Sequence, residues 1–138
     1  MKTHATATST DLACSLKRYF YSFLINQRRL SKHTVSAYRD TFKLLLPYIA
    51  KQQKKCISSL CFNDINADIV ILFLQHLEDE RNNKVQTRNA RLTAIRSFLR
   101  FAITDKPDLL ADMQPILAIP EKRQDRFTFD YLTKPEID

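Results

Sequence analysis

The sequence contains no glycine in its 138 residues, and this absence constrains the fold more than any other feature. Phosphate-binding loops and dinucleotide fingerprints need glycine where the backbone meets a phosphate, so both are excluded. The tightest hairpin turns and the usual αL caps of helices also favour glycine. The chain is therefore predicted to be all-helical and to lack the commonest cofactor sites.

Apolar residues recur every three to four positions in four long segments and one short one, which predicts a bundle of four to five helices. The expected helices cover about Asp11–Arg28, a segment from Lys32 capped by Ser31, a segment from after Asn66 to about Glu80 or Arg81, about Gln86–Ile103, and 108–118. Pro47 lies inside the second pattern, so that helix is expected to kink, or to end near Leu46 and restart. Residues Lys51–Lys55 are expected to form a frayed end and a loop.

The helical period also predicts which side chains form the core. In the first helix Tyr19 is expected to flank the apolar stripe, and in the second Tyr38 is expected to belong to it. The fourth helix has so wide an apolar arc that it is expected to be the central helix of the bundle. The expected core comprises Leu12, Leu16, Phe20, Phe23 and Leu24, then Val35, Tyr38, Phe42, Leu45 and Ile49, then Ile69, Val70, Phe73, Leu74 and Leu77, and finally Ala90, Leu92, Ala94, Ile95, Phe98, Leu99, Phe101 and Ala102.

Composition divides the chain into three parts. Residues 1–10 are polar and are expected to be a disordered tail, 11–118 the helical domain, and 119–138 a linker followed by the first residues of a truncated second domain. Thr133, Pro135 and Glu136 resemble the start of a further helix. No apolar run is long enough to span a membrane, and the first residues lack the apolar core of a signal peptide. We expect a cytoplasmic protein.

Positive charge is unevenly distributed. The chain has 22 Lys and Arg against 15 Asp and Glu, a net charge of +7, and residues 1–69 account for all of the excess. Residues 84–104 contain five cations and no acid. This distribution fits a polyanionic partner such as nucleic acid, although a basic surface can also serve solubility alone.

No catalytic or metal-binding set is evident. Cys56, Cys61 and His76 could be considered as zinc ligands, but the fourth ligand is missing and buried free cysteines are the preferred interpretation. Tyr131 has no basic residue arranged around it beyond Lys134, so it is not expected to be a nucleophile. The acidic run at residues 78–80 is interpreted as a solvated helix end.

Two helix starts combine features that bind DNA. Residues 31–34 (SKHT) and 86–91 (QTRNAR) each place hydroxyl or amide groups and cations in a first helical turn. Free backbone N–H groups there bind phosphates, and Asn, Gln or Arg can pair with base edges in a major groove. Each site alone could equally be a capped helix on a basic surface.

Three motifs resemble the N-terminal core-binding domain of phage-integrase-type tyrosine recombinases. SKHTVSAYRDTFKLLLPYI is similar to that family's Ser-x-x-Thr-x-x-x-Tyr-x-x-x-Phe helix, and TRNARLTAIRSFLRFA to its Thr-x-x-x-x-Leu-x-x-x-Arg-x-Phe helix. LCFNDINADIVILFLQHLEDER resembles the segment between them, while IPEKR and DYLTKPEID resemble the linker and the opening of the catalytic domain. These motifs occur in the family's order and spacing and extend over roughly residues 11–138.

The resemblance implies a SAM-like orthogonal bundle that forms one half of a C-shaped clamp on double-stranded DNA. The helices from Lys32 and from Gln86 would then face the major groove, and linker cations would follow the DNA backbone. The implied DNA contacts are Lys32, His33, Thr34, Arg39, Thr87, Arg88, Asn89, Arg91 and Arg96, with Lys122, Arg123 and Arg126 in the linker. The family works as a tetramer on paired sites, cuts DNA with a tyrosine, and needs no metal or other cofactor. The residues for that chemistry would lie beyond Asp138, so this chain would bind and position DNA without cutting it.

Two other functions compete with this interpretation. A helix-turn-helix regulator would use residues 28–31 as its turn, but the helix that follows is long and carries five large apolar residues and Pro47. A helical protein-interaction module would use its Leu and Phe stripes to dock a partner and would show no DNA affinity.

Overall fold

The structure is a computed structural model that describes residues 11–26, 30–82 and 84–123. Residues 11–18 are helical and continue into a π-helix, η1 (Tyr19–Phe23). The long helices that follow are α2 (Lys32–Gln53), α3 (Ala67–Glu80) and α4 (Val85–Asp105), and the chain then enters α5 (Leu110–Leu117). Short 3-10 turns are η2 (Ile57–Ser59), η3 (Phe62–Asp64) and η4 (Pro107–Leu109). The described residues form no strand, which confirms the all-α prediction.

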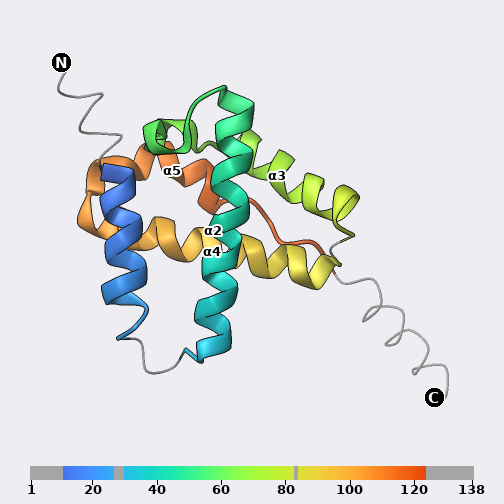
Figure 1. Cartoon of the computed structure of the whole chain (residues 1–138), viewed down its shortest axis with the longest axis horizontal. Coiled ribbons are helices and arrows are strands. Elements are labelled where there is room, and N and C mark those ends of the chain that lie inside the picture. The colour runs from blue at the N-terminus through green and yellow to red at the C-terminus, as the bar shows by residue number, and fades with distance from the viewer. Residues whose placement is uncertain (1–10, 27–29, 83, 124–138) are drawn as a thin grey trace.

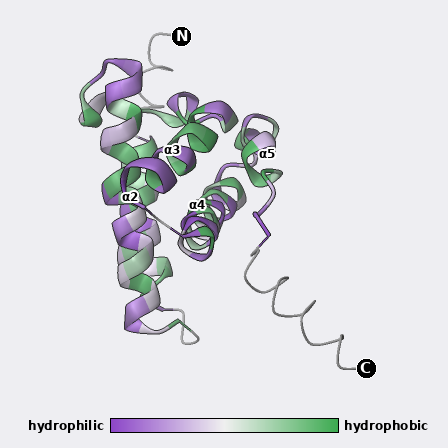
Figure 2. Ribbon diagram, turned by 90° about the vertical axis from the view of Figure 1, so that its right-hand side faces the viewer, coloured by the Kyte–Doolittle hydropathy of each residue, from purple (hydrophilic) through white to green (hydrophobic). Residues whose placement is uncertain are grey.

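Helix α4 is the centre of the bundle, as predicted. In Figure 1, α2 passes in front of α4 and runs across it, with the N-terminal helical segment beside α2. Figure 2 views α4 nearly end-on and places it between α2 and α5. Six apolar residues of α4 are buried, whereas Ala90, which was expected in the core, is exposed. No described helix is long and apolar enough to cross a membrane.

Side-chain caps start α2 and α3 where the sequence predicts them. The Ser31 hydroxyl accepts a hydrogen bond from the Thr34 N–H at 3.1 Å, and the Asn66 side chain accepts one from the Ile69 N–H at 2.9 Å. Beyond the end of α3, Asn82 takes φ = 54°, the left-handed conformation that glycine usually provides. Lys54 takes φ = 58° at the end of α2.

Helix α2 continues through Pro47 to Gln53, so the expected restart near Leu46 is wrong. Of the frayed end and loop expected at Lys51–Lys55, only Lys54 and Lys55 lie outside the helix. Pro47 removes one backbone donor and leaves the carbonyl of residue 43 without its helical partner. Pro47 is exposed, so water can satisfy that carbonyl. Leu45 and Ile49 on either side of Pro47 are fully buried, and their packing holds the helix together.

The π-helix η1 changes which aromatic residue reaches the core. The Leu24 N–H donates to the Tyr19 carbonyl at 2.9 Å, a five-residue step that shifts the helical register by one position. Tyr19, expected at the edge of the stripe, is completely buried on the face of Leu12, seven residues earlier, and the shift beyond Tyr19 turns Phe23 outward, where it is 37% exposed. Burial raises the pKa of Tyr19 to about 12, which keeps its hydroxyl neutral against Ser97.

A buried carboxylate organises the connection between α2 and α3. Asp64 accepts bonds from the Lys55 ammonium at 2.9 and 3.0 Å and from the Cys61 N–H at 2.9 Å. Burial alone would raise the pKa of Asp64, but the bonds from Cys61 and Lys55 outweigh it and bring the pKa below its ordinary value. The connection is therefore held best when Asp64 is ionised.

Because the pKa of Asp64 is lower in the folded chain, its contribution to stability is present above the unfolded pKa of about 4 and is lost as pH falls through the folded value. We expect Asp64→Asn to lower the free energy of unfolding by about 1–3 kcal/mol at pH 7. The difference from wild type should shrink below pH 4. Urea titrations at several pH values measure this, and a difference that does not vary with pH would contradict it.

The cysteines are more accessible than expected. Cys14 and Cys56 are exposed and Cys61 is half-buried, so the prediction of buried thiols is wrong. In the part of the chain that the structure describes, no three His, Cys, Asp or Glu side chains are grouped to hold a metal.

Candidate nucleic-acid interface

One side of α4 presents a line of exposed residues. Gln86, Ala90, Thr93 and Arg100 recur at the spacing of a single helical face, and all four are exposed. No acidic residue occurs in α4 before Asp105. The small side chains of Ala90 and Thr93 allow a polyanion to approach the helix closely.

The N-terminal half of α2 adjoins this face of α4. In Figures 1 and 2, α2 extends well beyond the point where it passes α4. Tyr38 of α2 lines one cavity together with Thr93, Ser97 and Arg100 of α4. Tyr38, expected in the core, packs against the core but is only half-buried, because it also lines this cavity. We call this face of α4, with Gln86, Ala90, Thr93 and Arg100, together with the part of α2 from Lys32 to Tyr38, the α2–α4 corner.

The predicted contacts on α2 are accessible. Lys32, His33 and Arg39 are exposed, and Thr34 is half-buried beside its cap Ser31. The Arg39 guanidinium lies 5.8 Å from the centre of the Phe20 ring, which leaves its outer edge open to solvent. Lys43, which the sequence analysis did not select, is exposed one helical turn further along.

The start of α4 is open to an anion. Its N-cap residue is Lys84, whose side chain makes no capping hydrogen bond, and Thr87 in the first turn is half-buried. The first-turn N–H groups of a helix have no intrahelical partner and carry a partial positive charge. Lys84 places a full positive charge at the same place.

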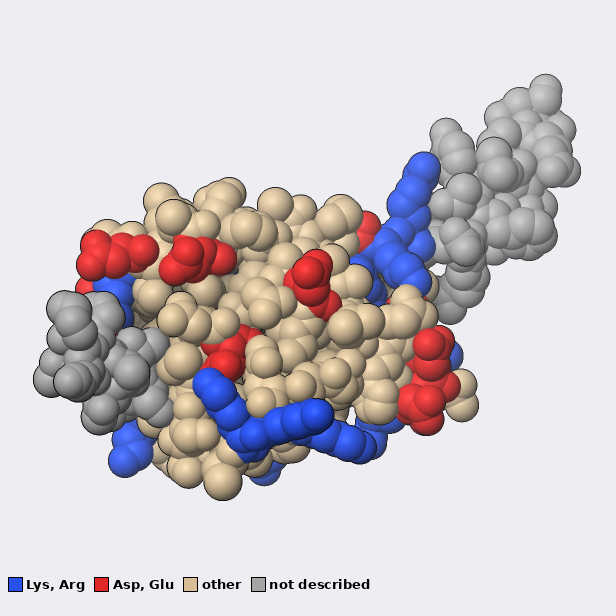
Figure 3. Space-filling view, turned by 90° about the horizontal axis from the view of Figure 1, so that it is seen from above, with Lys and Arg blue, Asp and Glu red and all other residues tan. Residues whose placement is uncertain are grey.

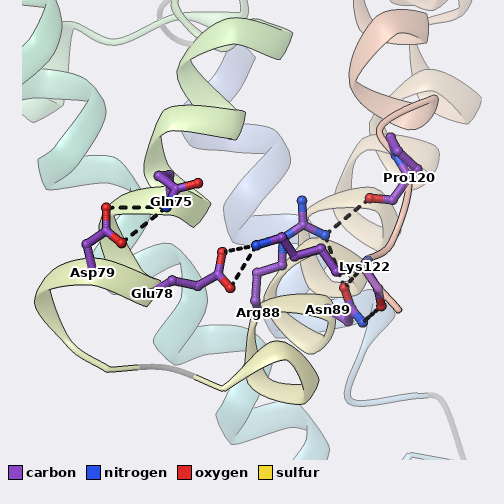
Figure 4. A network of polar contacts seen from close by, with 7 residues as sticks. All are labelled: Gln75, Glu78, Asp79, Arg88, Asn89, Pro120 and Lys122. Carbon is purple, nitrogen blue, oxygen red and sulfur yellow. Dashed lines mark hydrogen bonds and ion pairs between the residues drawn. The ribbon is translucent and has the colours of Figure 1, made fainter. Parts of the chain in front are cut away.

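Three of the predicted contacts instead bind the chain that follows α5. Arg88, only 7% exposed, donates to the Pro120 carbonyl at 3.2 Å and to the Asn89 side chain at 3.1 Å. Figure 4 shows Asn89 facing Lys122, and the Asn89 amide donates to the Lys122 carbonyl at 2.9 Å. The Lys122 N–H returns a bond to the Asn89 oxygen at 3.0 Å.

Arg96 and Lys122 complete this set of contacts. Arg96 donates to the Ile119 carbonyl and lies 3.7 Å from a carboxylate oxygen of Glu121. The Lys122 ammonium contacts both carboxylate oxygens of Glu78 on α3, at 3.0 and 3.1 Å. We call the group of side chains that holds residues 119–122 (Glu78 of α3 with Arg88, Asn89 and Arg96 of α4) the linker seat.

The other predicted contacts are dispersed. Arg91 lies where α2 and α4 meet and donates to the Thr41 hydroxyl at 3.2 Å. Arg123 is exposed beyond the linker seat, and Arg126 lies outside the described residues. The selected residues on α2 are therefore mostly exposed, whereas those on α4 are buried or half-buried, and four of them are hydrogen-bonded within the chain: Arg88, Asn89, Arg91 and Arg96.

Thr93 and Arg100 are exposed residues of α4 that are not among the contacts predicted from the sequence. They share the helical face of Gln86, so a stricter use of the period from that residue could have found them. No local pattern indicates that Arg88, Asn89 and Arg96 face residues 119–122, because the contact joins positions 23 to 33 residues apart.

A second group of cations lies at the other end of α2. Figure 3 views the molecule from the end at which α2 stops and shows a row of basic side chains there, with acidic side chains scattered separately. Lys51 and Lys54 are exposed at this end of the helix. Lys32 and Lys54 lie about 33 Å apart along α2 at 1.5 Å per residue.

Comparison with known proteins agrees with this architecture. The family model described as "Phage integrase, N-terminal SAM-like domain" matches residues 16–106. The chain is 43% identical over 128 residues to "Putative integrase/recombinase y4rC" of Sinorhizobium fredii, covering 93% of this chain and 39% of that protein. It is 37% identical to "Putative integrase/recombinase y4rD" of the same organism over 92% of this chain and 45% of that protein.

A third relative is more distant. "Tyrosine recombinase XerD" of Oceanobacillus iheyensis is 28% identical over 86% of this chain and 37% of that protein. The chain thus spans less than half the length of each of these relatives. No solved structure matches it. The family model covers about two thirds of the chain, and the residues it matches include the whole of α2, α3 and α4. This chain belongs to the family of phage-integrase N-terminal SAM-like domains.

Proposed function

We propose that this chain binds duplex DNA through the α2–α4 corner, as the N-terminal half of the clamp of a site-specific tyrosine recombinase. The observation that carries the proposal is the pairing of an exposed face on α4, which has no acidic residue before Asp105, with the exposed cations in the N-terminal half of α2. In this proposal the longer protein performs integration or recombination as a tetramer on paired sites. Strand cleavage belongs to residues outside this chain.

Four exposed cations would neutralise phosphates, three of them at the α2–α4 corner and the fourth, Arg39, on the side of α2 that faces Phe20. Lys32 and Lys84 stand at the starts of α2 and α4, while Arg39 and Arg100 lie further along the same helices. Phosphate contacts of this kind supply most of the affinity and set the register of a protein on DNA. Thr34, Thr87, Thr93 and Gln86 are then the polar side chains proposed to approach sugars or base edges.

The linker seat changes the assignment of the remaining candidates. Arg88, Asn89 and Arg96 already bond backbone groups of residues 119–122, so their donors would have to leave these partners to reach DNA. These three residues are therefore left out of the proposed set of DNA contacts.

The length and burial of α2 disfavour a helix-turn-helix reader. Helix α2 has 22 residues, of which Phe42, Leu45 and Ile49 are buried in the core. A recognition helix needs one face free along its length to enter the major groove. Figure 1 shows α2 extending on both sides of its crossing with α4, and its buried residues begin in the middle of the helix, so α2 could reach DNA only together with α4.

Fluorescence anisotropy of the 138-residue chain with a short duplex of unrelated sequence tests the proposal across a salt series. Four phosphate contacts predict a slope of about −3.6 in log affinity against log salt, because each contributes about 0.9. We expect micromolar or tighter binding at low salt. Absence of binding at low salt, despite the net charge of +7, would refute the proposal and favour a protein-interaction module.

A further inference from the structure

The linker seat recognises backbone groups. Three α4 side chains make four hydrogen bonds to the main chain of residues 119–122. Arg88 donates to the Pro120 carbonyl and Arg96 donates to the Ile119 carbonyl. Asn89 donates to the Lys122 carbonyl and accepts from the Lys122 N–H. The Asn89 amide pairs with both the N–H and the carbonyl of Lys122, as a neighbouring strand would. The seat therefore selects an extended course of the chain.

Residues 119–122 are also anchored at both ends. Ile119 is 5% exposed and belongs to the hydrophobic core, so the segment leaves α5 from a buried position. Three residues later the Lys122 ammonium bonds the Glu78 carboxylate of α3, whose side chain is 15% exposed. Figure 4 shows Glu78 and Asn89 reaching Lys122 from separate helices. A segment held from α3, α4 and the core has little freedom to change direction.

We propose that Arg88, Asn89 and Arg96 are positioning residues that hold residues 119–122 on α3 and α4. They thereby fix the point and direction in which the chain leaves the helical domain. The functional importance of this seat rests on the proposed function, since the two halves of a clamp must stand at a defined distance to close on one duplex. The same polar side of α4 would carry DNA at Thr93 and Arg100 and the departing chain at Asn89 and Arg96, so the seat ties the exit direction to the DNA-binding surface.

Amide hydrogen exchange by NMR on the 138-residue chain tests the seat. Asn89→Ala removes the acceptor of the Lys122 N–H and the donor to its carbonyl, and alanine is a better helix former than asparagine, so α4 should still fold. We expect the Lys122 amide to exchange about tenfold faster or more in the variant, because two hydrogen bonds are lost. Amides of Phe98 and Leu99 in the core of α4 should keep their rates.

Arg96→Ala and Arg100→Ala form a matched pair, since each removes one cation from α4. Arg96→Ala should speed exchange in residues 119–122 and leave DNA affinity within about threefold. Arg100→Ala should leave that exchange unchanged and weaken DNA binding by about sevenfold or more at 0.1 M salt.

The two proposals fail in different ways. Unprotected exchange of the Lys122 amide in the wild-type chain, or an unchanged rate in Asn89→Ala, would overturn the linker seat whatever the DNA measurements show. Weakened DNA binding in Asn89→Ala with no change in exchange would also overturn it and would make Asn89 a DNA contact. Protected exchange together with no DNA binding in the wild type would retain the seat and refute the proposed function alone.

Discussion

Replacing Tyr19 with alanine is expected to lower the free energy of unfolding by about 3–5 kcal/mol, the range for large buried aromatics. The Tyr19 side chain is fully buried, with ring centroids 4.9 Å from Phe20 and 5.4 Å from Phe98. Its hydroxyl is 2.5 Å from that of Ser97 on α4. Tyr19 thus joins the N-terminal segment to the central helix, and its removal leaves a cavity between them. Urea unfolding monitored by circular dichroism measures the loss.

Two further variants separate the contributions of Tyr19. Tyr19→Phe keeps the ring and removes the bond to Ser97, so a loss of about 1 kcal/mol is expected. Tyr21→Ala removes the same side-chain type two residues away, where it is 66% exposed, and should change stability by less than about 0.5 kcal/mol. Equal losses for Tyr19→Ala and Tyr21→Ala would contradict the register that the π-helix imposes.

Removing Lys32 and Arg100 together is expected to weaken DNA binding about 10- to 100-fold at 0.1 M salt. One cation stands at the start of α2 and the other lines the cavity between α4 and Tyr38. If both contact phosphates, Lys32→Ala/Arg100→Ala should reduce the salt slope by about 1.8, which is twice 0.9. Anisotropy across the salt series measures both the affinity and the slope.

A matched control uses the opposite end of α2. Lys51→Ala/Lys54→Asn also removes two positive charges, and asparagine tolerates the left-handed backbone at position 54. This control should change the slope by less than about 0.5 if contacts are confined to the α2–α4 corner. An equal loss in both double variants would show that binding follows net charge alone, and the assignment of the interface would fail.

The helices themselves could be predicted from sequence because their determinants are local. Ser31 and Asn66 start α2 and α3 through bonds three residues away, and the five predicted core residues of α3 are all buried. The errors arose where packing outweighs local preference. Pro47 does not end α2 because it faces water while Leu45 and Ile49 are held in the core.

Only part of the candidate site could be predicted from the sequence. A helical wheel places Arg96 and Arg100 on one polar side of α4, yet Arg96 bonds Ile119 while Arg100 is exposed. Nothing within α4 distinguishes the two arginines. The two arginines differ because residues 119–122, which follow α5, lie against α4 beside Arg96, where the Ile119 carbonyl accepts its hydrogen bond.

The sequence by itself determined the helical class, the caps, the basic character of the first 69 residues and the motifs that identify the family. These are set by composition, by periodicity and by residues within one or two helical turns of each other. Only the tertiary structure decided that Tyr19 enters the core, that Tyr38 lines a cavity, and that Arg88, Asn89 and Arg96 hold the departing chain. Each of these depends on contacts between segments far apart in the chain, and a helix presents the same polar stripe whether water, DNA or its own backbone covers it.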